Sequence, residues 1–203
     1  FSKARKMNPN ITKEVNYHNR IISTFIGQKI EAIFYEEINY EENKEYWEFS
    51  KIIHSIDMNV IMKFSNGKLI QLFWDNEFES YGIGFIEIFE LETKEGYKLI
   101  QVSDNINWKN IIGKTISAIK VYWDESESQS LQKVFNYLIP IGRKTHIRLP
   151  LTWEINFEGE NLWISTLELR ENGNPYYCAD HLTIMFSEDD ANKYSLKNPQ
   201  NNK

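Results

Sequence analysis

The chain repeats one order of hydrophobic and polar positions. An apolar stripe at helical spacing ends at a glycine and gives way to strand-like alternation, first over residues 18–33 and again over residues 108–119. Residues 25–33 and 111–119 are identical at five of nine positions, at an offset of 86. Gly27 and Gly113 stand where the residue after a helix takes a positive φ. Each segment therefore predicts a helix, a turn and a strand.

Two β-hairpins follow these segments at an offset of 93. Residues 60–69 and residues 153–162 each alternate apolar and polar positions up to a short turn that contains Gly67 or Gly159, and then enter a second apolar run. Further strands are predicted at residues 84–91, 97–102, 162–170 and 176–186.

The same order of helix, glycine, strand, acidic insertion and hairpin thus occurs twice, and duplication explains this more simply than coincidence. The alternative is that such patterns recur wherever helices end and hairpins turn. We predict an α+β protein, mostly antiparallel β with a few short helices. Two tandem similar halves, about 15–103 and 104–196, are expected to pack as one pseudo-symmetric domain spanning residues 1–203, because each half alone buries only a modest core. Residues 197–203 are predicted to be a frayed tail.

Two helices are predicted outside the repeat. Residues 126–138 place four apolar side chains on one helical face, and Pro140 stands just beyond them. Residues 188–194 form a short helix with Ser187 as its N-cap.

Composition favours a globular cytoplasmic protein. Hydrophobic residues make up 41% of the 203 positions, and the single Cys178 excludes an internal disulfide and a Cys-based metal cluster, which fits a reducing compartment. No run approaches the ~18–20 apolar residues of a membrane span, and residues 1–10 lack the apolar core of a signal peptide. A bias towards Ile and Asn indicates an AT-rich, bacterial genome.

Charge is unevenly distributed along the chain. The whole chain carries −6, but six basic residues lie at the termini, so residues 7–191 carry −12. A strongly acidic body disfavours nucleic acid as a ligand, since that binding depends on neutralising phosphates. It favours a cationic partner.

Two acidic clusters with an aromatic residue follow the repeated first strands. Carboxylates accelerate the encounter with a basic protein, and Tyr or Trp supplies buried contact area. Since the clusters begin at equivalent strand ends, we expect them on related edges of the fold. The alternative is a pair of solvated acidic loops. The candidate partner-binding residues are Tyr35, Glu36, Glu37, Glu41, Glu42, Glu45, Trp123, Asp124 and Glu125.

No catalytic, phosphate-binding or calcium-loop motif is present, and no cofactor or metal is predicted. A hydrolase that uses His54 with Asp57, or His181 with nearby acids, remains an alternative. Cys178 and Asp180 face one side of a predicted strand and His181 faces the other, which favours a buried thiol and a surface histidine over a joint site.

In size, acidity and layout the chain resembles bacterial immunity proteins, which protect a cell from a polymorphic or contact-dependent toxin. The resemblance implies a non-enzymatic inhibitor that occludes the basic cleft of a cationic toxin domain, with carboxylates in place of substrate phosphates. The alternative is a small-molecule or lipid-binding module with an apolar cleft between the halves, suggested by 6 Trp, 11 Tyr and 12 Phe.

Overall fold

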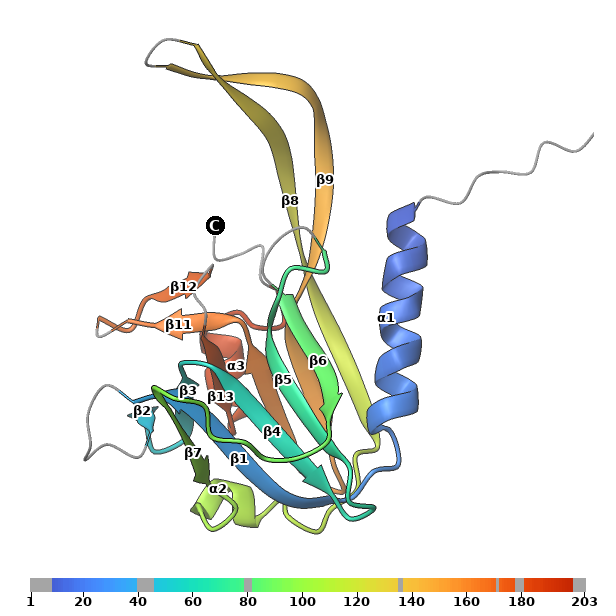
Figure 1. Cartoon of the computed structure of the whole chain (residues 1–203), viewed down its shortest axis with the longest axis vertical. Helices are drawn as coiled ribbons and strands as arrows, with labels where there is room; N and C mark the ends of the chain where they lie inside the picture. Colours follow the sequence, from blue (N-terminus) through green and yellow to red (C-terminus); the bar gives the residue numbers. More distant parts are fainter. Residues whose placement is uncertain are drawn as a thin grey trace, which may run out of the picture.

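The computed structural model describes residues 9–39, 46–78, 82–134, 137–170, 172–177 and 181–198. Most of the predicted tail lies outside these ranges. The elements, labelled in Figure 1, are α1 (Pro9–Phe25), β1 (Ile30–Ile38), β2 (Trp47–Ser50), β3 (Ile53–Ile56), β4 (Asn59–Phe64), β5 (Leu69–Asp75), β6 (Gly82–Ile88), β7 (Tyr97–Gln101), α2 (Ile106–Lys109), β8 (Ala118–Val134), β9 (Tyr137–Asn156), β10 (Asn161–Ser165), β11 (Leu167–Leu169), β12 (Pro175–Tyr177), β13 (Leu182–Met185) and α3 (Glu188–Lys193).

Two antiparallel sheets share one core. The first has the order β6-β5-β4-β1-β7 and the second the order β2-β3-β13-β10-β9-β8, while β11 and β12 form a small ribbon. Inward side chains of both sheets, such as Met62 and Trp153, belong to a single buried cluster. The prediction of a mostly antiparallel β protein with a few helices is confirmed.

The predicted N-terminal helix is present as α1, and its apolar stripe closes one side of this core. Tyr17, Ile21 and Phe25 are at most 2% exposed. Ile22, which the helical spacing places on the same apolar stripe, is 58% exposed and lies off the buried face. The aromatic ring of Phe25 meets that of Trp153 edge to face at 5.3 Å. Within the described residues, no helix is long and apolar enough to cross a membrane.

Strand pairing in the two sheets corresponds residue by residue. In the first sheet Ile33 pairs with Met62, and in the second Ile119 pairs with Ile155. These pairs are related by the offsets of 86 and 93 found in the sequence. Each sheet contains a four-strand meander, β6-β5-β4-β1 in the first and β13-β10-β9-β8 in the second.

Reciprocal hydrogen bonds join the starts of the two meanders. The amide of Gly27 donates to the carbonyl of Ile116 at 2.9 Å, and the amide of Gly113 donates to the carbonyl of Ile30 at 2.8 Å. Both glycines have positive φ, +80° and +83°, as the sequence predicted. A second reciprocal pair runs from Ile30 to Lys114 and from Ile116 to Gln28.

Outside the meanders the halves differ. Strand β7 pairs with β1 and has no counterpart in the second sheet among the described strands. The β2–β3 insertion of the first half joins the second sheet, where β3 pairs with β13. The corresponding insertion of the second half is a long two-stranded arm, the distal part of β8 and β9, which projects from the body (Figure 1).

The arm corrects one prediction, because residues 126–134 extend β8 and are not helical. The helical spacing of Leu131 and Val134 competes here with a strict alternation of serine at positions 126, 128 and 130, which has the period of a strand. Pro140 lies within β9, paired with Leu131, and does not mark a helix end.

The two sheets differ in what covers their outer faces. In the second sheet Trp163 and Met185 are buried beneath the C-terminal segment with Ala191 and Leu196. Helix α3, which Ser187 caps by accepting from the Asp190 amide, belongs to this cover, as predicted. Among the described elements, no helix covers the outer face of the first sheet (Figure 1).

Candidate functional site

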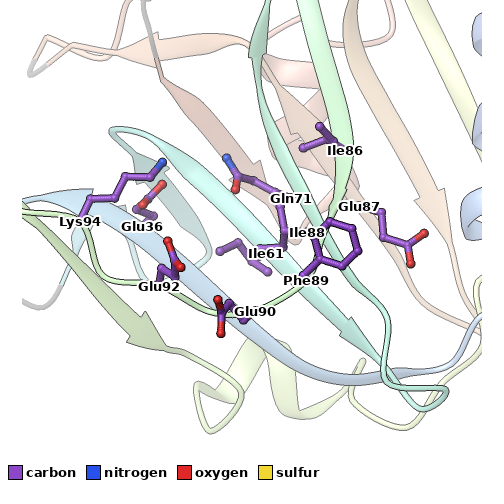
Figure 2. Close-up of a pocket in the computed structure, with 10 residues that line it drawn as sticks. All are labelled: Glu36, Ile61, Gln71, Ile86, Glu87, Ile88, Phe89, Glu90, Glu92 and Lys94. Atoms are coloured by element: carbon purple, nitrogen blue, oxygen red, sulfur yellow. The ribbon is translucent and has the colours of Figure 1, made fainter.

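A groove of about 380 Å³ lies on the outer face of the first sheet. Its floor consists of Glu36 on β1, Ile61 on β4 and Gln71 on β5, and Ile86 and Ile88 of β6 form one wall (Figure 2). The period of two in each strand explains this lining, because Met62 and Ile70 face the core and leave Ile61 and Gln71 on the opposite face.

The opposite wall is the crossing segment, residues 89–96. Because β6 and β7 lie at opposite edges of the sheet, the chain between them must pass over β5, β4 and β1. The amide of Asn39 donates to the carbonyl of Gly96 at 2.9 Å and fixes the far end of the crossing beside β1. The groove is therefore a product of strand order.

The groove combines an apolar surface with an acidic rim. Four glutamates and one lysine line it. Glu36 is 4% exposed and accepts a hydrogen bond from Asn59, and Glu87 pairs with Lys68 at 2.9 Å. Glu90 and Glu92 of the crossing segment form no ion pair within the described part of the chain. The rim thus presents carboxylates that are available to a cationic ligand.

Apolar side chains beside these carboxylates are unusually exposed. Phe89 on the crossing segment is fully exposed, and Ile86 on β6 is 54% exposed. Apolar side chains exposed together and rimmed by polar residues are the kind of surface that marks binding sites. The site can therefore supply both attraction for a cation and apolar contact area.

The predicted cluster on β1 is divided between the two faces of the sheet. Glu36 points outward into the groove, while Tyr35 and Glu37 are buried on the inner side, 0% and 3% exposed. The interpretation of Tyr35 as a surface anchor does not fit this position, since strand alternation turns the ring into the core. Glu41, Glu42 and Glu45 lie outside the described residues.

The predicted cluster on β8 is at the root of the arm. Trp123 is half-buried beside Tyr17, with 5.7 Å between ring centroids, and the Arg148 guanidinium lies 5.5 Å from the Trp123 ring. Arg148 forms ion pairs with Glu125 at 3.1 Å and with Glu14 of α1. These contacts fix the arm to the helix, while the Glu125 side chain stays 56% exposed.

Asp124 is also buried, at 5% exposure. Strand β1 ends towards β2 and β3, whereas β8 continues into the arm, so the described residues of the two predicted clusters lie in different parts of the fold (Figure 1).

A buried polar chain links Tyr35 to His54 and Trp108. The Trp108 indole N–H donates to the Tyr35 hydroxyl at 2.6 Å, and that hydroxyl lies 2.8 Å from Nδ1 of His54. Burial lowers the pKa of His54 to about 4, although Glu48 at 3.8 Å opposes this, so the imidazole is neutral at pH 7. The suggested pairing of His54 with Asp57 is wrong, because His54 is held by Tyr35 instead.

A second polar cluster joins the buried Glu37 to the half-buried Asp57 and His181. His181 Nε2 lies 2.9 Å from a carboxylate oxygen of Asp57, and the Asp57 amide donates to Glu37 at 3.3 Å. Burial, together with the charge of Asp57, raises the pKa of Glu37 to about 8. The other oxygen of Glu37 is buried without a hydrogen-bond partner. Glu37 is therefore mostly protonated at pH 7.

The Asp57–His181 contact can orient an imidazole, which was one element of the hydrolase alternative. Cys178 and Asp180, the other residues considered with His181, lie outside the described ranges. In the part of the chain that is described, no three His, Cys, Asp or Glu residues are grouped so as to hold a metal ion.

Sequence reasoning found Glu36 but missed the rest of the groove. The pattern of residues 84–91 predicts a strand that includes Phe89 and Glu90, and alternating acids at 90 and 92 fit a strand edge as well as a loop. Their role depends on β6 and β7 lying at opposite edges of the sheet, which local pattern does not encode. The signal that could have found them was the acidic, aromatic composition of residues 89–95.

Comparison with known proteins found no matching family model, no matching curated protein and no matching solved structure.

Proposed function

We propose that the protein is a non-enzymatic binding protein of the immunity type, which acts in the cytoplasm and inhibits a cationic protein such as a toxin domain. The observation that carries the proposal is the groove on the first sheet, where four glutamates and one lysine lie beside exposed apolar side chains. A basic segment of the partner occupies this groove. The protein then covers the part of the partner's surface that surrounds this segment and so inhibits the partner. Nucleic acid is not the ligand.

Charge and apolar area have separate roles in this proposal. The acidic rim attracts the partner over a distance of about 10 Å at 0.1 M salt and so raises the association rate. Phe89 and Ile86 then supply contact area that becomes buried in the complex. Of the residues predicted from sequence that the structure describes, Glu36 alone lines the groove.

The packing between the sheets favours this function over a ligand cleft. Phe25, Phe85 and Trp153 fill the centre of the interior with edge-to-face contacts of 5.1–5.5 Å between ring centroids. The abundance of aromatic residues, which suggested a small-molecule or lipid-binding module, is thereby explained by the core.

We further propose that the two halves arose by duplication and form one pseudo-symmetric domain. Equivalent register and reciprocal hydrogen bonds support this. On the second sheet Trp163, paired with Glu154, is covered by the C-terminal segment; the equivalent Gln71, paired with Ile61, lies in the groove. The covered outer face of the second sheet then stabilises the fold, and the outer face of the first sheet binds the partner.

The test is calorimetric binding to the product of the neighbouring gene at 50 and 300 mM salt. Neutralising the rim with Glu90→Gln and Glu92→Gln should weaken binding roughly tenfold at low salt and reduce the salt dependence. The matched control changes two exposed acids away from the groove, Asp104→Asn and Glu158→Gln, and should bind like the wild type. Equal binding of the rim variant and the wild type at 50 mM salt would refute this mechanism.

A further inference from the structure

The arm is held firmly at its root and extends far beyond it. Leu149 and Pro150 are buried, and Arg148 ties the root to α1. Beyond that point the strands pair from Ser126 with Ile147 to Val134 with Tyr137. About nine residues per strand give an arm roughly 30 Å long.

The distal arm exposes apolar side chains. Tyr137 is 75% exposed and Leu138 is 64% exposed, while Ile139 and Ile141 are each more than 40% exposed. The distal parts of β8 and β9 pair only with each other among the described strands. Because a two-stranded hairpin alone is only marginally stable in water, such an arm gains stability when a second surface covers it.

Charge identifies the surface that suits the arm. Residues 126–147 contain Lys133, Arg143 and Lys144 against one acid, Glu127, which pairs with Lys144 at 2.6 Å. The arm therefore carries +2 while the rest of the chain carries −8. A cationic partner would repel the positively charged arm. The groove, with four glutamates, one lysine and exposed apolar residues, matches the arm in both charge and apolar surface.

The arm does not reach the groove of its own chain. It points away from the body, whereas the groove lies on the face of β1, β4 and β5 (Figure 1). We propose that the free protein is a two-fold dimer in which the arm of each copy lies in the groove of the other. The inference rests on the proposed function, because it names a second occupant of the same groove, which the cationic partner must displace.

The area of contact is sufficient for such a dimer. An arm about 30 Å long and about 10 Å wide covers on the order of 300 Å². The dimer has two contacts of an arm with a groove, and each contact buries this area on the arm and again on the groove. The total is on the order of 1,200 Å², which is the lower end of the range for stable interfaces.

A charge exchange across the contact tests the dimer. Sedimentation equilibrium of the full chain should show a wild-type dimer at micromolar concentration. Arg143→Glu in the arm and Glu90→Lys at the groove should each weaken dimerisation roughly tenfold or more, because each creates like-charge contacts. Both residues are exposed, so folding should be unaffected, which circular dichroism verifies.

Mixing the two variants is the decisive step. In the mixed dimer one contact places a glutamate at position 143 beside a lysine at position 90, and the other keeps Arg143 beside Glu90. The mixture should therefore associate within about threefold of the wild type, although each variant alone does not. The matched control, Glu158→Gln, should leave the dimer unchanged.

Three results would overturn the inference: a wild-type monomer at about 100 μM, which means a Kd far above the micromolar range; a dimer that responds to Arg143→Glu but not to Glu90→Lys; and a mixture that stays as weak as its components. The second result indicates an arm-to-arm contact. A monomer that still binds the cationic partner through Glu90 and Glu92 would end the dimer proposal alone, whereas a dimer without such partner binding would end the proposed function alone.

Discussion

Replacing Glu37 by glutamine should stabilise the protein at alkaline pH. The side chain is 3% exposed, one of its oxygens has no hydrogen-bond partner, and burial raises its pKa from 4.5 to about 8. Since a tenfold change in an ionisation constant corresponds to about 1.4 kcal/mol, ionising the folded protein at this position costs at most ~5 kcal/mol. Glutamine has a similar shape and can keep the contact with the Asp57 amide.

The direction in which the stability of the wild type changes with pH follows from the number of protons that the folded and unfolded states bind. Between pH 4.5 and 8 the folded state holds a proton on Glu37 that the unfolded state has lost, so wild-type stability falls as the pH rises through this window. Above pH 8 the full penalty applies. Below pH 4.5 both states are protonated and the penalty vanishes.

Urea unfolding at pH 5, 7 and 8.5 measures the effect. Glu37→Gln should match the wild type within about 1 kcal/mol at pH 5 and exceed it by several kcal/mol at pH 8.5. Glu158→Gln, at an exposed acid, is the matched control and should follow the wild type at all three values. A Glu37→Gln protein that loses stability with pH as steeply as the wild type would contradict the reasoning.

Four further substitutions test the packing by urea unfolding. Tyr35→Phe removes the buried hydroxyl that two side chains contact, and should cost about 2 kcal/mol; a change under ~0.5 kcal/mol would argue against the network. Gly82→Ala would place a Cβ 2.7 Å from Cδ of Pro150 at the arm root and should cost about 1–3 kcal/mol; wild-type stability would mean that β6 and the root are not in contact. Gly27→Ala and Gly113→Ala each strain a positive φ and should cost about 1 kcal/mol; a cost at one position alone would argue against equivalent turns.

The hydrophobic pattern of the sequence predicted those helices and strands whose residues fit only one period, either helical or strand-like. Helix α1, the hairpins β4–β5 and β9–β10, and the cap at Ser187 were each marked by one period and a suitable turn or cap residue. The distal arm was not predicted correctly, because the sequence of residues 126–138 fits both a helical and a strand period. Pairing with β9 decided between the two periods.

The candidate site was predicted less well, because it depends on spatial order. Strand alternation separates Glu36 from its neighbours Tyr35 and Glu37, although all three are adjacent in an acidic segment. Glu90 and Glu92 reach Glu36 only because the chain crosses the sheet between β6 and β7. A sequence shows that such acids exist, but not which of them converge.

The pairing of β3 with β13 has a consequence for how the molecule unfolds. A strand that the chain reaches before residue 57 completes the sheet of the second half, and the start of β1 is bonded to the segment that precedes β8. Neither half can loosen without breaking backbone contacts of the other. The molecule should therefore unfold in one cooperative transition, and a fragment cut near residue 103 should not fold by itself.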